Sequence, residues 1–380
     1  MPIYFDNAAT SHPKPECVVR AVNRALTEFN ANPGRAGHRT ALEAARAVLD
    51  SREQLAGLLG AADPMSVVHC FNATDALNLA IKGSLRAGDH VVATQLEHNS
   101  VLRPLGALAA RGRIGLTLVP PRPDGFVDPD DIRRAMTDRT ALIVCTHASN
   151  VTGAIQPVAA IGQLAKARGV RYLIDGAQAL GGMPVDVKAL GCDLYAFPGH
   201  KSLLGPQGTG GLYIAPGMRL ETLREGGTGT ASESILQPEE LPERYESGTV
   251  NLPGIAGLGA GCAWVAERLD QVMMHERELT QALCEGLRAI PGAVVYSPLQ
   301  EAARAGIVCF NLGDMPSSQV ADAMARRDIA VRGGLHCAPG AHRFLGTLDR
   351  GAVRASVGPS NTFGEVESFL EAVGRLAASA

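Results

Sequence analysis

The stretch that decides the fold is residues 170–214, whose sequence is VRYLIDGAQALGGMPVDVKALGCDLYAFPGHKSLLGPQGTGGLYI. Its apolar runs VRYLID (170–175), LYAF (194–197) and GGLYI (210–214) predict three strands, the last two joined by a glycine-rich turn. Asp175 ends the first strand and Lys201 follows the second. Because adjacent strand ends meet at one edge of a sheet, we expect both side chains in the same crevice.

The same alternation extends upstream. SVVHCF (66–71), HVVAT (90–94) and ALIVC (141–145) predict strands, and each precedes an amphipathic, helical run. Strands that alternate with helices imply an α/β fold with a mostly parallel sheet covered on both faces. Ligands of such sheets bind at the carboxyl ends of the strands. The polar positions after those ends are Asn72, Ala73, Thr74, His98, Asn150, Asp175, Gln178, His200 and Lys201.

The pattern changes after Pro253. Residues 254–290 contain few helix breakers after their first turns and predict one long helix. Strands at VVYS, GIVCFNL and AVRASV, a helix near 317–327 and a terminal helix from Glu365 follow. We expect a large α/β domain over 15–255 and a smaller α+β domain made of 1–14 plus 256–380.

Composition excludes several classes of protein. The chain has 380 residues, 46% hydrophobic and 19% charged, with a net charge of −3. This balance is typical of a soluble globular protein and gives no electrostatic reason to expect nucleic acid or membrane binding. The start MPIYFDNAAT lacks the features of a secretory signal, so a cytoplasmic location is the default expectation. The absence of GxxxxGK[ST] and of a strand-GxGxxG-helix pattern disfavours an ATP or NAD enzyme.

The eight cysteines form no CxxC pair, so neither a disulfide framework nor a zinc site is indicated. Seven of them are expected to be small buried hydrophobic residues. Cys337 differs because glycines precede it and Pro339 follows, which predicts an exposed loop. Arg332 and His336 could supply the positive charge that favours a nucleophilic thiolate. His336, Cys337 and His342 lack a fourth ligand, and no metal site is predicted.

A lysine and a carboxylate in one crevice suit pyridoxal 5'-phosphate (PLP), which needs an amine for its Schiff base and an acid beside its ring nitrogen. By itself the Asp175 signal is weak, since an aspartate at a strand end is often a helix cap. The wider motifs are more specific. DGAQALGG (175–182) and FPGHKSLLGPQGTGGLY (197–213) together resemble the class V aminotransferase family, in its cysteine desulfurase and selenocysteine lyase group. Further motifs match in order across the chain: YFDNAAT, FNATDALNLA, QLEHNSV, THASNVTG, RYESGTVNLPGIAGLGA, RGGLHCAP and VRASVGPSNT.

The resemblance implies the PLP-dependent transferase fold of type I and a role for each matching residue. Lys201 would carry the cofactor and act as general base, and Cys337 would take the substrate sulfur as a persulfide. Asp175 would pair with the ring nitrogen, Gln178 would contact the ring 3′-oxygen and His98 would stack on the ring. Phosphate would be bound by Ala73, Thr74 and His200, and by Gly248 and Thr249 of a second subunit. Substrate would be bound by Arg354, Asn150, Arg332 and His38. Asn150 would also contact the cofactor, and His98 would be catalytic as well as cofactor-binding.

The expected activity is that of a PLP-dependent cysteine desulfurase, a sulfurtransferase that works as a homodimer with shared active sites and delivers sulfur to an acceptor protein. A selenocysteine lyase, another carbon–sulfur lyase of this family, and a PLP-binding scaffold of a sulfur-carrier complex are the alternatives. Two residues depart from the family pattern. Pro198 stands where a phosphate-binding serine is usual, and Leu335 stands where related proteins often have a second histidine.

Overall fold

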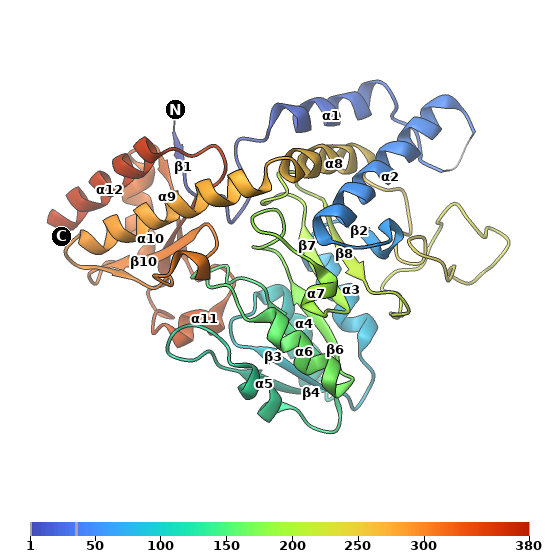
Figure 1. The fold of residues 1–380 in the computed structure, drawn as a ribbon, viewed down its shortest axis with the longest axis horizontal. Helices are drawn as coiled ribbons and strands as arrows, with labels where there is room; N and C mark the ends of the chain where they lie inside the picture. The colour runs from blue at the N-terminus through green and yellow to red at the C-terminus, as the bar shows by residue number, and fades with distance from the viewer. Residues whose placement is uncertain (1, 35–36, 380) are drawn as a thin grey trace.

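The computed structural model describes residues 2–34 and 37–379, and a seven-stranded sheet forms its centre (Figure 1). The strand order is β2-β8-β7-β6-β5-β3-β4, and β8 alone runs antiparallel to its neighbours in this sheet. The strands are β2 (Val67–Cys70), β3 (His90–Thr94), β4 (Gly115–Val119), β5 (Thr140–Thr146), β6 (Arg171–Asp175), β7 (Leu194–Pro198) and β8 (Gly210–Ile214). The predicted α/β class and mostly parallel sheet are therefore confirmed.

Helices cover both faces of this sheet. Successive residues of each strand point to opposite faces, so they enter two different cores. Val91 packs with α3 (Ala73–Ser84) and α4 (Asn99–Ala110) on one face. Val92, the next residue, packs on the other face with α2 (Arg39–Leu59), α6 (Val158–Arg168) and α8 (Leu252–Ala266). Both faces are thus buried, as the apolar runs of the strands predict.

Several elements were not predicted from the sequence. They include α1 (Glu16–Thr27), α2, the edge strand β4, α5 (Pro129–Ala135), the one-turn helix α7 (Val187–Leu190), α11 (Pro339–Phe344), the short helices Pro64–Ser66 and Glu301–Ala303, and three strands of two or three residues near the two ends of the chain. In β4 all but the last residue keep some exposure, so it lacks the continuous apolar run of the central strands. The helices α1 and α2 pack on α8 at one end of the molecule (Figure 1).

The C-terminal part forms a second, antiparallel sheet in the order β12-β13-β10-β9. Its elements are β9 (Ala293–Val295), β10 (Ile307–Leu312), β12 (Arg332–Gly334) and β13 (Ala352–Ser356), with α9 (Leu269–Ala289), α10 (Ser317–Ala325) and α12 (Phe363–Ala378) packed on it. Residues from the N-terminus join this part, since β1 (Ile3–Tyr4) pairs in parallel with β11 (Ile329–Ala330). Leu258, Cys262 and Val265 of α8 belong to the core of the large sheet. We therefore propose that the domain boundary lies after α8 rather than at residue 256.

The prediction of one long helix over 254–290 is wrong. The chain forms α8 and α9, separated at Glu267 and Arg268, and the backbone of Arg268 leaves the helical region with φ −129 and ψ 7. Its guanidinium donates to the carbonyl oxygen of Trp264 and so satisfies an acceptor at the end of α8. The break lets α8 stay within the large domain while α9 lies along the small sheet, and no local sequence signal marks this change.

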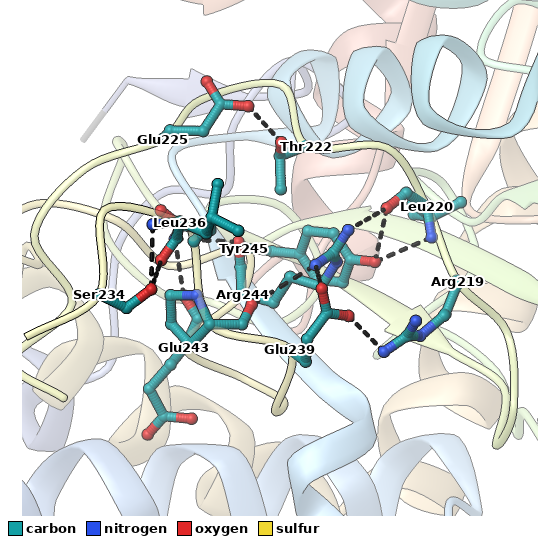
Figure 2. Close-up of polar contacts among 12 residues, drawn as sticks. Arg219, Leu220, Thr222, Glu225, Ser234, Leu236, Glu239, Glu243, Arg244 and Tyr245 are labelled. Atoms are coloured by element: carbon teal, nitrogen blue, oxygen red, sulfur yellow. Dashed lines mark hydrogen bonds and ion pairs between the residues drawn. The ribbon is translucent and has the colours of Figure 1, made fainter. Parts of the chain in front are cut away.

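Residues 215–251 have no regular secondary structure and project from the body beside β8 (Figure 1). Figure 2 shows the polar contacts that hold this segment. The Tyr245 hydroxyl donates to the Leu220 carbonyl (3.0 Å) and accepts from the Leu220 N–H (2.8 Å), while Glu239 pairs with Arg219 and Arg244. Within the described ranges, no helix has the length and apolar character needed to cross a bilayer.

Candidate active site

One cavity of about 210 Å³ lies at the carboxyl ends of the central strands, between the large sheet and the loop after β12. It is lined by eleven of the fourteen residues to which the family resemblance gives a role. These are Ala73, Thr74, His98, Asn150, Asp175, Gln178, His200, Lys201, Arg332, Cys337 and Arg354. Residues from most of the length of the chain therefore line one cavity.

Lys201 and Asp175 reach this cavity from adjacent strands. Asp175 lies opposite Ala196 in the pairing of β6 with β7, and Lys201 follows the end of β7. Burial lowers the pKa of Lys201 to about 8; Asp175 opposes this shift, and Arg354 and Arg332 add to it. Burial also raises the pKa of Asp175, whose carboxylate accepts one hydrogen bond, from the Ala177 N–H at 3.0 Å. Among the described residues, the Lys201 amine has no hydrogen-bond or ion-pair partner.

The start of α3 offers an anion site. Asn72 is the N-cap and its side chain accepts only the N–H of Asp75. The N–H groups of Ala73 and Thr74 have no acceptor in the described part of the chain, so they are free to bind an oxyanion. The helical run predicted after the strand 66–71 is confirmed as α3, and Pro198 faces the same cavity without an N–H or hydroxyl to offer.

His98 is the N-cap of α4, and its Nδ1 accepts the N–H of Ser100 at 3.0 Å. Nδ1 therefore carries no proton and Nε2 carries the proton of the neutral ring. Burial, with smaller contributions from Lys201 and nearby arginines, lowers the pKa of His98 to about 4. Burial and the neighbouring Lys201 likewise lower the pKa of His200 to about 4. Both rings are thus neutral near pH 7.

Arg354 on β13 is 2% exposed and also lines the cavity. It donates to the carbonyl oxygen of Asn150 (3.0 Å) and to the Asp6 carboxylate (2.9 Å), while its Nε has no partner in the described part of the chain. Asp6 was not among the predicted site residues, although it belongs to the YFDNAAT motif. A buried guanidinium with an unused N–H suits a carboxylate ligand.

The Cys337 thiol is exposed, whereas six of the other cysteines are buried and Cys17 is half-buried. The loop around Cys337 is held in a specific conformation, since His336 and Cys337 both have positive φ, 48 and 57. Asn150 donates to the His336 carbonyl oxygen at 2.6 Å, and the Asn99 N–H donates to the Cys337 carbonyl oxygen at 2.7 Å. Two contacts to the large domain therefore present the thiol at the cavity.

The expectation that His336 could supply positive charge is wrong. Its side chain is buried and its Nε2 donates to the Ala352 carbonyl oxygen. Burial, with Arg354 as the next contribution, lowers the pKa of His336 to about 2, so the ring stays neutral. Arg332, which is exposed and lines the cavity, is the remaining candidate for a cation near Cys337.

Three predicted residues do not reach the cavity within this chain. His38 is exposed and caps α2 by accepting the Ala41 N–H. Gly248 and Thr249 are also exposed, and Thr249 lines a different hollow, with Glu246 and Asn251. The Gln178 amide is present at the cavity but donates to the Ala8 carbonyl oxygen at 3.1 Å.

Ser100 is a further residue of the site that the sequence analysis did not predict. Ser100 lines the cavity and is 9% exposed. Its position two residues after His98 is the only local signal that could have pointed to it. A serine at the second position of a helix is ordinary, so its contacts rather than its sequence context identify it.

Comparisons with known proteins agree on one family. The family model "Aminotransferase class-V" matches residues 3–369. A probable cysteine desulfurase of Methanothermobacter thermautotrophicus is 37% identical over 99% of this chain and 94% of that protein. The structure of a cysteine desulfurase from Thermococcus onnurineus superposes with a TM-score of 0.94 at 33% identity, over 100% of this chain and 95% of that one. A cysteine desulfurase from Escherichia coli gives 0.90 at 28% identity over the same shares.

Proposed function

The chain belongs to the class-V aminotransferase family, and we propose that it is a cysteine desulfurase that converts L-cysteine to L-alanine and passes the sulfur to an acceptor. The observation that carries this proposal is that Lys201 and Cys337 line one cavity, although 135 residues separate them in the sequence. The names of the relatives point to the same reaction.

The cofactor of this family is PLP, and the residues present fit it. The unpartnered Lys201 amine suits covalent attachment, the buried Asp175 carboxylate suits a cationic ring nitrogen, and the free N–H groups of Ala73 and Thr74 suit a phosphate. When bound, PLP supplies an electron sink that stabilises negative charge on the substrate α carbon.

Each residue of the site then has a distinct role. Lys201, with a pKa near 8, can accept the substrate α proton at its Nζ and later return a proton. Asp175 would hold the ring nitrogen in its protonated form by accepting its hydrogen bond. His98, which is neutral, would pack against the ring. Arg354 and Asn150 hold the substrate carboxylate, with the unused Nε of Arg354 as one donor.

Sulfur transfer requires an acceptor, and the Cys337 thiolate fills this role. Its Sγ attacks the substrate sulfur, so an S–S bond forms as the C–S bond breaks and the bonding electron pair remains with the substrate carbon. A proton then completes alanine, and Cys337 is left as a persulfide. The sum is L-cysteine plus thiol giving L-alanine plus persulfide. Arg332 is an exposed cation that lines the same cavity as Cys337.

The experiment that tests this function is product analysis with PLP-loaded protein. Cysteine should yield alanine, and mass spectrometry before reductant should find the added sulfur on Cys337. Selenocysteine assayed in parallel decides between the desulfurase and the selenocysteine lyase alternative. Pyruvate and ammonia in place of alanine would instead indicate an eliminating carbon–sulfur lyase, and PLP binding without any product would indicate the scaffold.

We also infer a homodimer with shared active sites. The support is that Gly248 and Thr249 lie outside their own cavity, on the projecting segment where Ile235 and Leu236 are almost fully exposed (Figure 1). Covering such side chains is favourable in a symmetric interface. Mixing Lys201→Ala chains with Thr249→Ala chains should regenerate some fully intact sites. Full activity of a monomer in sedimentation would contradict the proposal.

The inferred compartment is the cytoplasm, where a free thiol persists. All eight cysteines are free, and an exposed nucleophilic thiol such as Cys337 is kept reduced in that compartment. The acceptor is proposed to be a protein that approaches the exposed face of the Cys337 loop, since a sulfur on that thiol is accessible from outside. A persulfide that transfers only to small thiols would argue against a protein acceptor.

A further inference from the structure

We propose that Ser100 is a positioning residue that connects the phosphate-binding end of the cavity to His98 through two hydroxyl contacts. The proposal rests on PLP binding in this cavity, as set out above. In this role Ser100 orients the Thr74 hydroxyl toward a bound phosphate. Phosphate binding then changes the hydrogen bond between Ser100 and the His98 ring.

The geometry places Ser100 between the other two residues. Its Oγ lies 2.7 Å from the Thr74 Oγ1 and 2.9 Å from the His98 Nδ1. Its backbone N–H donates to the same Nδ1 at 3.0 Å. All three residues line the cavity, and Ser100 is 9% exposed. The hydroxyl is therefore fixed between two partners in a place that water hardly reaches.

The hydroxyl protons of Thr74 and Ser100 allow two arrangements of these hydrogen bonds. Nδ1 of the neutral His98 can only accept. In the first arrangement, Thr74 donates to Ser100 and Ser100 donates to Nδ1. In the second, Ser100 donates to the Thr74 oxygen, and the Thr74 hydroxyl proton is free to point into the cavity. The backbone N–H of Ser100 keeps Nδ1 satisfied in both cases.

A phosphate dianion selects the second arrangement because its oxygens only accept hydrogen bonds. The Thr74 hydroxyl then donates to phosphate, and Ser100 turns its proton from His98 to Thr74. Binding of phosphate therefore removes one of the two donors from Nδ1 and changes the electron density of the His98 ring. The hydrogen bond from the Thr74 hydroxyl to phosphate matters more here because Pro198, which lines the same cavity, provides no donor.

The first test compares PLP with pyridoxal, which lacks the phosphate. Ser100→Ala should weaken PLP binding by about three- to tenfold, the range for one net hydrogen bond, and leave pyridoxal binding unchanged. Ser84→Ala is the matched control, since Ser84 is also a buried serine on a helix but its hydroxyl has no partner in the described part of the chain. Ser100→Thr, which keeps the hydroxyl, should restore PLP affinity.

The second test needs neither the cofactor nor activity. Inorganic phosphate added to protein labelled with ¹⁵N-histidine should shift the Nδ1 resonance of His98, and Ser100→Ala should remove that shift. Thr74→Val combined with Ser100→Ala should lose no more PLP affinity than Thr74→Val alone, because the serine acts through Thr74.

The outcomes separate this proposal from the proposed function. Equal losses of PLP and pyridoxal affinity in Ser100→Ala, or additive losses in the double variant, would overturn the role of Ser100. Failure of the unaltered protein to bind PLP would instead overturn the cofactor assignment. Thermal unfolding of each variant shows whether a loss of affinity reflects a loss of stability. If Ser100→Ala is destabilised, the PLP affinity of Ser100→Thr decides whether the hydroxyl has the proposed role.

Discussion

The two sides of the cavity are built in opposite ways. On one side the buried Asp175 ends β6 and the half-buried Lys201 follows β7. Desolvation raises the pKa of Asp175 and lowers that of Lys201, which favours the neutral form of each. On the other side Cys337 is exposed, on a loop in which two residues have left-handed backbone conformations. Desolvation therefore lowers the pKa of the lysine amine, whereas backbone contacts hold the loop that exposes the thiol.

Removal of the Lys201 amine should have the largest effect. Lys201→Ala should bind PLP only weakly and should lose turnover by at least about 10²–10⁴-fold, the contribution of a positioned general base alone. Borohydride reduction of the unaltered protein should fix the cofactor on Lys201. The exposed Lys82→Ala is the control, and a reduced adduct on any other lysine would show that the assignment is wrong.

Removing the exposed thiol should have a narrower effect. Cys337→Ala should reduce alanine formation from cysteine to background while PLP binding stays intact, because only the sulfur acceptor is lost. Some turnover of selenocysteine should remain, since selenium leaves more readily. Cys17→Ala, at the other cysteine that is not fully buried, is the control. Undiminished alanine production from cysteine by Cys337→Ala would mean that another group accepts the sulfur.

Neutralising the buried carboxylate should cost less than removing the lysine. Asp175→Asn should still capture PLP on Lys201, but kcat should fall by about 10²–10³-fold, the range for one preorganised electrostatic partner. Asp193→Asn is a matched control, because Asp193 is partly buried beside the same strands and lies outside the cavity. A kcat equal in both variants would show that Asp175 has no special role.

The smallest expected effect is on pH dependence. Because burial lowers the pKa of Lys201 from 10.5 to about 8, the reactive neutral amine increases as pH rises toward 8. The rate at which the apoprotein captures PLP should rise by about tenfold per pH unit below 8 and level off above it. Stopped-flow absorbance measures this rate. A rise that continues to pH 10 would indicate an amine that is not desolvated.

The elements that the sequence predicted correctly are those with strong local patterns. The strands 90–94 and 210–214 coincide with β3 and β8, and Asp175 and Lys201 follow from the order of strand ends. Less regular patterns were missed, as in β4, where exposed and buried residues mix. The break between α8 and α9 was missed because both halves have helical character, and only packing against different domains separates them.

Apolar periodicity and motif order are properties of the sequence, so the α/β class and the family could be recognised from it. Lys201, Asp175 and Cys337 are among the site residues that it predicts. Only the tertiary structure decided that His336 is buried and neutral, that Arg354 is paired with Asp6, and that Ser100 joins Thr74 to His98. The physical reason is that charge state and hydrogen bonding depend on burial and on partners distant in sequence. Those neighbours exist only once the strands and loops have come together.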